Sequence, residues 1–441
     1  MAHPDYLVVG AGASGLAFVD SLVDHADDVR VTVVDRRQAP GGHWQDAYPF
    51  VRLHQASVFY GVASTELGTG SRQTEGPEAG LHERATAPEI CAYYESVMER
   101  LLRTGRVRFH LGTEYVAGDA GTARVVDAHY LEPGIPATSP PPFAVDSGTV
   151  IPVGQLVSLV DTPSQYVVVG SGKTATDACV WLLGNGVDPD AICWVRPREP
   201  WMLNRAVVQP DPAVFIGMVA DVVESAAAAD SLDDLFLRLE AGGVMLRIDR
   251  RVTPTMARTP TLAQWELELL RSIENVVRLG RVRRVRRGAI ELDGGEVRVA
   301  EDAVVVHCAA SGFPDVPPVP LWAPDAIRLQ PIRSGFPCFG AALAGYVEAT
   351  RATDHEKNRL CPATPYGNSL AEWARMTVLG ARGAAAFGAE PDIAEWAQRC
   401  LLNPARVAPE HQDRPEVTAV QQRMAEHAPP GFARLAELAG V

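Results

Sequence analysis

A glycine-rich turn near the start of the chain has the residue types that bind the pyrophosphate of a dinucleotide. The segment Gly10-Ala11-Gly12-Ala13-Ser14-Gly15 has the spacing G-x-G-x-x-G. The first glycine permits a tight turn, the second lets the backbone approach the phosphates, and the third lets a helix pack closely on a strand. Asp35 stands 20 residues after Gly15 and can accept hydrogen bonds from a ribose. We therefore expect dinucleotide contacts from Gly10, Gly12, Ala13, Ser14, Gly15 and Asp35.

The elements around this turn are those that the motif requires. Residues 6–9 (Tyr-Leu-Val-Val) form an apolar run short enough for a buried parallel strand. Leu16, Val19 and Val23 then recur at helical spacing. Residues 31–35 (Val-Thr-Val-Val-Asp) read as a second strand that ends in the carboxylate. A strand, a helix with its N-terminus at the phosphates and a second strand indicate a Rossmann-like unit.

The same plan returns 160 residues later. Residues 166–169 lead into Gly170-Ser171-Gly172-Lys173-Thr174-Ala175, and a further strand is expected at 191–195. That strand ends in Arg196-Pro197-Arg198 instead of an acid. Arginines at this place suit the 2′-phosphate of NADP, which a carboxylate would repel; NAD stays an alternative. We expect contacts from Gly170, Gly172, Lys173, Thr174, Arg196 and Arg198.

The second turn also resembles the phosphate loop of nucleoside triphosphatases, because it reads Gly-Ser-Gly-Lys-Thr. That loop needs a glycine five residues before the second glycine of the turn. Val167 occupies this position, inside the expected strand. The spacing therefore disfavours an ATPase.

Charge and cysteine content exclude several classes of function. The net charge of −14 argues against a nucleic-acid partner. We interpret the one basic run, 281–287, as an exposed strand edge, since its five arginines alternate with valines. The seven cysteines are scattered and none has the C-x-x-C spacing, which disfavours a disulfide reductase and indicates a reducing compartment. Neither a signal pattern at residues 1–6 nor a membrane-spanning apolar stretch is found, so we expect a cytoplasmic protein without a membrane partner.

The segments that follow the two turns carry a family resemblance. Asp35 is followed by Gly41-Gly42-His43-Trp44, then by Tyr48-Pro49 and Arg52-Leu53. A late strand at 302–313 ends in Ala310-Ser311-Gly312-Phe313. With the arginine-tailed second turn, this order resembles the flavoprotein monooxygenases with two dinucleotide-binding domains, namely the flavin-containing, N-hydroxylating and Baeyer–Villiger enzymes.

The resemblance implies an α/β fold with two Rossmann-like dinucleotide-binding domains, the NADP domain being inserted into the FAD domain. The FAD domain would occupy 1–155 and return at 306–441 with C-terminal helices, and the NADP domain would occupy 160–305. Residues 213–239 are rich in Ala, Val, Leu and Asp and predict a helical insertion at about 212–242. Such helices either cover a substrate cavity, form the face of a homodimer, or only cover the domain from solvent.

The resemblance also implies the cofactors FAD and NADPH and adds site residues. Gly41 and Gly42 would lie near the FAD phosphates and Trp44 near the flavin, with Arg36, Ser311 and Gly312 as further cofactor contacts. His43, His54 and Arg205 are the candidates for catalysis, although a histidine in this setting more often hydrogen-bonds a cofactor or the backbone. Asp177 reads as a helix-surface residue. No cluster has metal-ligand spacing, so no metal is expected.

For the reaction, the resemblance implies that NADPH reduces FAD and that a C4a-(hydro)peroxyflavin formed with O₂ transfers one oxygen atom to a small organic substrate. These enzymes usually carry a Phe-x-Gly-x-x-x-His motif before the second turn. Residues 150–159 contain the glycine, Gly154, but no histidine. Two alternatives stay open: an NADPH-dependent flavin oxidoreductase without oxygen insertion, and a non-catalytic nucleotide-binding redox sensor.

Overall fold

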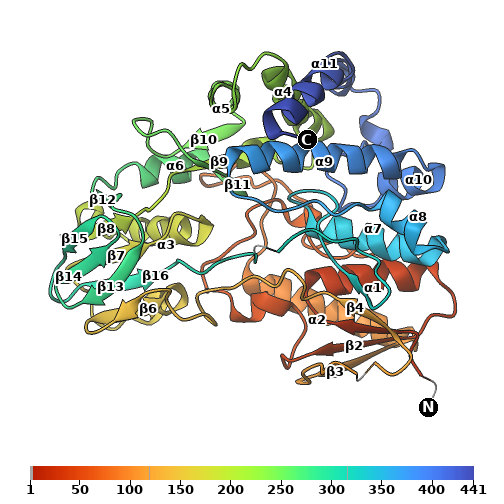
Figure 1. Cartoon of the computed structure of the whole chain (residues 1–441), viewed down its shortest axis with the longest axis horizontal. Coiled ribbons are helices and arrows are strands. Elements are labelled where there is room, and N and C mark those ends of the chain that lie inside the picture. Colours follow the sequence, from red (N-terminus) through yellow and green to blue (C-terminus); the bar gives the residue numbers. More distant parts are fainter. Residues whose placement is uncertain (1–2, 119, 315) are drawn as a thin grey trace.

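The computed structural model describes residues 3–118, 120–314 and 316–441. Its first domain is built on a parallel sheet in the order β17-β4-β1-β2-β3 (Figure 1). The strands are β1 (Tyr6–Val9), β2 (Val31–Asp35), β3 (Val107–Leu111), β4 (Arg124–Asp127) and β17 (Ala326–Arg328). The central strand is buried because sheet neighbours and helices cover it, which explains its apolar composition.

Three long helices pack in this domain, namely α1 (Ala13–His25), α2 (Ala87–Arg103) and α7 (Pro337–Thr350). Helix α2 begins with a capping box, in which the Thr86 backbone N–H donates to the carboxylate of Glu89. Helices α1 and α7 approach closely: a Cβ on Gly345 would lie 2.3 Å from the carbonyl oxygen of Phe18. The chain can therefore bring α7 over the glycine turn only because residue 345 has no side chain.

The second domain repeats the plan with a parallel sheet in the order β12-β8-β7-β16-β6. The strands are β6 (Thr149–Pro152), β7 (Tyr166–Val169), β8 (Ile192–Val195), β12 (Val276–Val277) and β16 (Val304–His307), and the packed helices are α3 (Lys173–Gly184) and α6 (Gln264–Leu270). A smaller sheet in the order β15-β14-β13-β5 lies beside it and contains β5 (Ala144–Val145), β13 (Val282–Arg286), β14 (Ala289–Leu292) and β15 (Gly295–Arg298).

The second domain is inserted into the first. The chain leaves the first sheet after β4 and returns to it at β17, and these two strands pair in parallel. This strand order confirms the predicted fold class. The crossover comes earlier than the expected 155–160, because β5 and β6 already belong to the second domain. The return comes later than 306, because β16 still belongs to the second sheet.

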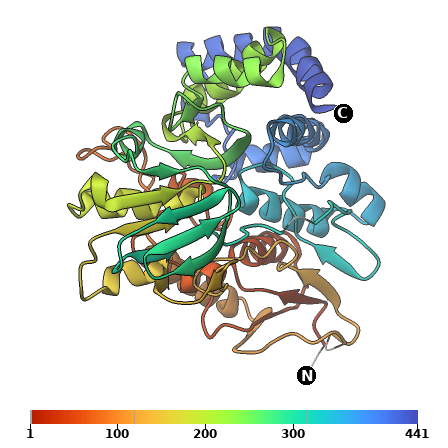
Figure 2. The ribbon, with the colours of Figure 1, turned by 60° about the vertical axis from the view of Figure 1, so that its left-hand side comes forward.

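A third layer covers the two domains on one side and includes the predicted helical insertion. The insertion consists of α4 (Pro212–Ala227) and α5 (Leu232–Ala241), which lie next to a sheet of β9 (Pro200–Asn204), β10 (Met245–Arg247) and β11 (Met256–Leu262). Helix α4 lies side by side with the C-terminal helix α11 (Pro415–Ala439) at the top of Figure 2. The remaining helices are α8 (Asp354–Leu360), α9 (Leu370–Gly388) and α10 (Pro391–Arg399).

Short 3-10 helices connect several of these elements: η1 (Gly42–Asp46), η2 (Ser57–Phe59), η3 (Val153–Ser158), η4 (Pro189–Ala191), η5 (Arg205–Val207) and η6 (Pro409–His411). Within the described residues, no helix combines the length and apolar character needed to cross a membrane.

Candidate active site

The first glycine turn connects β1 to α1 in a shape that only glycines permit. Gly10 has a φ of +114°, a conformation that L side chains rarely adopt. A Cβ on Gly15 would lie 2.0 Å from the carbonyl oxygen of Gly10, so the helix could not pack on the strand. Gly12 is different, because its nearest neighbour in the protein would be the Cα of Gly42, 3.5 Å away. The fold needs Gly10 and Gly15, whereas Gly12 leaves room beside the backbone.

The N-terminus of α1 is not capped by a side chain. Its N-cap residue is Gly12, and no side chain accepts a hydrogen bond from the first-turn N–H groups. By contrast, Asp211, Ser231 and Thr353 cap α4, α5 and α8 with side-chain oxygens. Uncapped N–H groups and the helix dipole favour an anion at this end.

Asp35, predicted from the sequence to bind a ribose, lies at the end of β2. Its side chain is buried and lines the same cavity as the glycine turn. The backbone N–H groups of Ala11 and Arg37 donate to its two carboxylate oxygens at 2.7 and 2.8 Å. Arg36, expected as a cofactor contact, does not line this cavity and pairs with Glu132 at 2.6 Å. The neighbouring Arg37 lines the cavity instead.

The predicted Gly-Gly-x-Trp segment lies against the first turn. The Gly41 N–H donates to the carbonyl of Ala11 at 2.9 Å, and a Cβ on Gly42 would approach the Cα of Gly12 to 3.0 Å. Trp44 is buried, and its indole N–H donates to the hydroxyl of Tyr60 at 2.6 Å. The segment therefore closes one wall beside Gly12, where the sequence placed the phosphates and the flavin.

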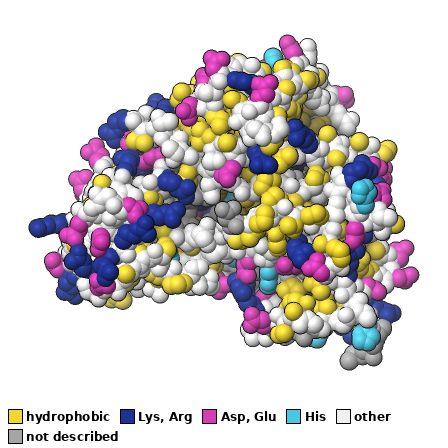
Figure 3. Space-filling view, in the orientation of Figure 1, with side chains coloured by type: hydrophobic (Ala, Val, Ile, Leu, Met, Phe, Trp, Pro, Cys, Tyr) yellow, Lys and Arg dark blue, Asp and Glu magenta, His cyan; other side chains and the backbone are white. Residues whose placement is uncertain are grey.

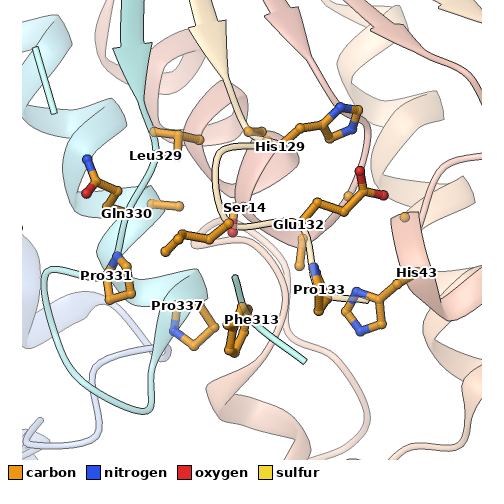
Figure 4. Close-up of a pocket in the computed structure, with 18 of the residues that line it drawn as sticks. Ser14, His43, His129, Glu132, Pro133, Phe313, Leu329, Gln330, Pro331 and Pro337 are labelled. Carbon is orange, nitrogen blue, oxygen red and sulfur yellow. The ribbon is translucent and has the colours of Figure 1, made fainter. Parts of the chain in front are cut away.

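The cavity at the first turn, here called the FAD cavity, is lined from three sides (Figure 4). The turn contributes Ser14, the segment after β4 contributes His129 and Glu132, and the loop before α7 contributes Gln330 and Pro331. The N-terminal residue of α7, Pro337, also lines it, and α7 has no side-chain cap. None of these residues outside the turn carried a sequence motif, because they come from segments about 100 to 300 residues apart along the chain.

A second space, the central cavity, continues from the FAD cavity toward the second domain. The two share His43, Tyr60, Phe313, Pro337 and Tyr366. The central cavity is further lined by Trp44 and His54 from the first domain and by Lys173, Thr174 and Asp177 from α3 of the second. It therefore lies between the two glycine turns, where a group bound at one turn would meet a group bound at the other.

Both candidate histidines line the central cavity in the neutral form. Burial lowers the pKa of His43 to about 4, with the nearby Arg37 charge adding to the effect. Burial lowers the pKa of His54 to about 3, assisted by Lys173 and Arg205. The Nδ1 atom of His54 has no hydrogen-bond partner among the described residues. At neutral pH each of these side chains can donate one hydrogen bond. Neither is the protonated imidazolium that could act as a general acid.

The expectation that Asp177 is a helix-surface residue is wrong. Its side chain is only 12% exposed and lines the central cavity. It pairs with Lys173, one turn before it on α3, and accepts a hydrogen bond from the hydroxyl of Tyr48 at 2.6 Å. Burial, together with the charge of Asp177 and the hydrogen bond to it, raises the pKa of Tyr48 well above its ordinary value. Helical periodicity did not predict this, since the covering residue comes from the first domain.

The second glycine turn lines a third space, the NADP cavity, with the predicted Gly170, Gly172, Lys173 and Thr174. Gly170 has a φ of +144°, and Gly172 caps α3 without a side-chain hydrogen bond. Ser311 and Gly312 also line this cavity, next to the second turn rather than next to the first. The repeated plan therefore gives two uncapped helix ends on opposite sides of the central cavity.

The arginines that line the NADP cavity differ in part from those predicted from the sequence. Arg198 lines it together with Arg281 and Arg283 from the run interpreted as a strand edge. Several Lys and Arg side chains gather over this lobe, on the left of Figure 3. Arg198 and Arg281 line the same cavity, and burial together with the Arg281 charge lowers the pKa of Arg198. The run does form a strand, β13, but not a sheet edge, because β13 pairs with β14 on one side and β5 on the other; the start of the run lines the NADP cavity.

Arg196 does not line the NADP cavity. Its side chain is 2% exposed, pairs with Glu199 at 3.0 Å and stacks over the ring of Trp194 at 4.5 Å. Arg196 directly follows the last residue of β8 and is buried, whereas Arg198 lies two residues further along and reaches the cavity. The geometry therefore favours Arg198 over Arg196 for a phosphate contact.

Arg205 is a structural residue in this geometry. It is 1% exposed, and its guanidinium donates to both Glu78 and Glu266, the latter at 2.8 Å. Its remaining donors reach the carbonyl of His54 at 3.2 Å and the carbonyl of Thr261 at 3.3 Å. Since these contacts use the guanidinium donors, Arg205 has none directed at a nucleotide. It connects the loop of the first domain to β11 and α6.

No cluster of three or more metal-ligating side chains occurs among the described residues.

Three comparisons bear on this site. A family model described as an NAD(P)-binding Rossmann-like domain matches residues 8–63 and confirms the predicted nucleotide-binding unit. The uncharacterized proteins Rv2000 of Mycobacterium tuberculosis and Mb2023 of Mycobacterium bovis are each 40% identical over 416 residues, which cover 90% of this chain and 77% of theirs.

Solved structures that resemble the chain include oxidized steroid monooxygenase bound to NADP, at 15% identity and a TM-score of 0.47, covering 100% of this chain and 98% of that one. An open cyclohexanone monooxygenase matches at 15% identity and a TM-score of 0.46, covering 98% of this chain and 99% of that one. A flavin monooxygenase variant from Stenotrophomonas maltophilia matches at 14% identity and a TM-score of 0.47, covering 79% of this chain and 98% of that one. The fold described above follows from the strand order alone.

Proposed function

The chain belongs to the family that contains these mycobacterial proteins, and we propose that it is an FAD- and NADPH-dependent monooxygenase that inserts one oxygen atom from O₂ into a small organic substrate. The observation that carries the proposal is the central cavity, which connects two glycine turns whose helices both begin without a side-chain cap.

The residues at the first turn fit FAD. The open space beside Gly12 and the uncapped α1 N-terminus suit the pyrophosphate, and the oriented carboxylate of Asp35 suits a ribose. The N-terminus of α7 at Pro337 lines the same cavity and suits a ring that gains negative charge on reduction. These features support FAD rather than a second NADP at this turn.

The residues at the second turn fit NADPH. Gly172 and the α3 N-terminus suit its pyrophosphate, while Arg198 and Arg281 place two cations at the rim. A 2′-phosphate carries more negative charge than a hydroxyl and would relieve the repulsion between these arginines. The same repulsion supports NADPH over NADH.

In the central cavity the protein's task is to position the reactants and shield them from water, and it supplies few acid–base groups. A bound flavin would accept hydride from NADPH and supply the chemistry with O₂. Trp44, Tyr60 and Phe313 give the cavity an aromatic lining, of which Trp44 and Tyr60 are buried. The neutral His43 and His54 offer hydrogen bonds, and Lys173 is held by Asp177 at the junction of the two cavities. Few titrating side chains are needed for such a reaction.

One observation favours the second candidate, an NADPH-dependent flavin oxidoreductase without oxygen insertion. Gly154 of η3 lines the central cavity, as the family motif would place it, but the segment 150–159 contains no histidine. The proposal and this alternative share both cofactors and differ only in the fate of oxygen.

Stopped-flow absorbance of the FAD-loaded protein separates these functions. Mixing with NADPH without oxygen should bleach the oxidised flavin within seconds. Mixing the reduced protein with air should then give a transient spectrum distinct from both the reduced and the oxidised flavin. Direct reoxidation with stoichiometric hydrogen peroxide would identify the oxidoreductase. Absence of bleaching would contradict both enzymes and favour the redox sensor.

The arginines give an independent test of the second cofactor. Arg198→Ala and Arg281→Ala should each raise KM for NADPH by about 10- to 100-fold with little change for NADH, because a charged contact to phosphate contributes roughly 1.5–3 kcal/mol. Arg284→Ala is the matched control, since its side chain pairs with Asp146 at 2.6 Å and does not line the NADP cavity. Equal losses for both nucleotides would refute the 2′-phosphate contact.

A further inference from the structure

An apolar cavity lies under the inserted helices, apart from both glycine turns. We call it the insert cavity; Phe215, Met218 and Val222 of α4, Trp373 and Met376 of α9, and Phe432 of α11 line it. These helices form the layer at the top of Figures 1 and 2. Gln55, Thr259 and Gly335 line both the insert cavity and the central cavity, so the two adjoin.

One cation stands in this apolar lining. Arg333, in the loop between β17 and α7, is the only charged side chain among the described residues that line the insert cavity. Its Nη1 donates to the amide oxygen of Asn403 at 3.2 Å, and its Cζ lies 5.8 Å from the centre of the Phe215 ring. Burial lowers the pKa of Arg333 to about 10, so the side chain is still charged at neutral pH.

Arg333, which is partly buried, has no carboxylate partner, unlike the fully buried arginines. Arg196 pairs with Glu199, and Arg205 pairs with Glu78 and Glu266. No carboxylate lies within 4.0 Å of the Arg333 guanidinium among the described residues. Removing part of a charge from water is costly unless the charge is paired, and one amide and one ring face do not replace a counter-ion.

We propose that the insert cavity binds an apolar molecule that carries a carboxylate, with the carboxylate on Arg333 and the apolar part between α4, α9 and α11. A single guanidinium matches one carboxylate in a two-point contact, whereas a phosphate dianion calls for more cations than this lining holds. As a statement about the substrate class the inference rests on the proposed function, because the insert cavity adjoins the central cavity.

Fluorescence quenching tests this binding in the FAD-loaded protein. The probes are 10-bromodecanoate and 10-bromodecan-1-ol, which differ only in the charged end, and bromine quenches a tryptophan that it approaches. The acid should bind about tenfold or more tightly than the alcohol, as expected for a charge-assisted contact. Trp373→Phe should remove most of the quenching by the acid, because Trp373 lines the cavity.

Arg333→Gln should bring the affinity for the acid down to that for the alcohol, while Arg333→Lys should retain part of the difference. Arg238→Gln, on the exposed face of α5, should leave both affinities unchanged. Equal affinity of the unmodified protein for acid and alcohol would overturn the proposal, and this comparison does not depend on the folding of any variant. Quenching that persists in Trp373→Phe would also overturn it, because the acid would then be bound elsewhere.

These titrations contain no NADPH and require no turnover. Failure of NADPH to bleach the flavin would refute the proposed function but would not affect the proposed carboxylate-binding site. Failure of the acid to bind would refute the site and leave the flavin chemistry standing.

Discussion

At the scale of single residues, the glycines of the first turn have separable roles. Gly15 is required by the fold, since a Cβ there would lie 2.0 Å from the backbone oxygen of Gly10. Gly12 has only the Cα of Gly42 nearby, at 3.5 Å, so the protein itself tolerates a methyl group. What the methyl group would obstruct is the approach of a pyrophosphate to the backbone.

Gly12→Ala should therefore lose FAD while keeping its fold. We expect the flavin-to-protein absorbance ratio after desalting to fall at least about tenfold, with an unchanged far-ultraviolet circular dichroism spectrum. Gly15→Ala is the comparison variant and should lose both flavin and fold. Retention of FAD by Gly12→Ala at the level of the unmodified protein would contradict the binding role.

His54 should make stability depend on pH in a defined window. Its pKa is about 3 in the folded chain and about 6.5 when unfolded, so below pH 6.5 the unfolded state binds more protons. The free energy of unfolding should be fully maintained above pH 6.5 and fall as the pH drops toward 3, by up to about 1.4 kcal/mol per pH unit.

Urea unfolding at several pH values measures this dependence. His54→Gln should flatten the slope between pH 4 and 6, because glutamine does not titrate. His411→Gln, in the exposed η6 segment, is the control and should leave the slope as it is. An identical slope in His54→Gln and the unmodified protein would show that His54 does not cause it.

At the scale of elements, the insertion and the C-terminal helix form one packed unit. A Cβ on Gly431 of α11 would lie 2.3 Å from the carbonyl oxygen of Val223 on α4. Arg423 of α11 also pairs with Asp221 of α4 at 2.7 Å. The covering layer of the insert cavity is therefore made by segments about 200 residues apart that approach closely at one glycine.

Gly431→Ala should force α4 and α11 apart and lower the free energy of unfolding by about 1–3 kcal/mol, the usual effect of overpacking. Gly184→Ala is the matched control at the end of α3, where a Cβ would meet nothing within 4 Å. That variant should be neutral or more stable by up to about 1 kcal/mol, because alanine favours helix. Thermal or urea unfolding of both variants gives the comparison, and equal stability would refute the close-contact explanation.

At the scale of the whole molecule, a buried ion network connects the two domains. Arg205 lies between Glu78, in the loop that precedes α2, and Glu266 on α6. Arg84 also pairs with Glu78, at 2.7 Å. The arginine charges hold the pKa of Glu78 at about 2, although burial opposes this. The network reaches one wall of the central cavity, because Arg205 donates to the carbonyl of His54, which lines that cavity.

Arg205→Ala should lower the free energy of unfolding by about 3–5 kcal/mol, because it leaves two buried carboxylates with fewer partners. Arg238→Ala breaks an exposed pair with Asp234 and should cost less than about 1 kcal/mol. Urea unfolding compares the two. A loss below 1 kcal/mol for Arg205→Ala would show that the network does not hold the domains together.

The sequence by itself determined the two nucleotide-binding units and their order. Gly10, Gly15 and Asp35 have roles that are local, since they depend on neighbours within one strand–turn–helix–strand unit. The same holds for Gly170 and for the helical insertion, whose periodicity shows along the chain. Local geometry of this kind is encoded over about 30 residues and can be read from spacing.

Only the tertiary structure decided which charged side chains face the cavities. Arg196 and Arg198 look equivalent in the sequence, but one is buried on Glu199 and the other lines the NADP cavity. Arg205, a candidate for catalysis in the sequence, is held by two glutamates from distant segments. Arg333 carried no motif, and its importance lies in the absence of a carboxylate among the described residues around it. The physical reason is that the free energy of a charge depends on what surrounds it in space, and those surroundings come from segments hundreds of residues away.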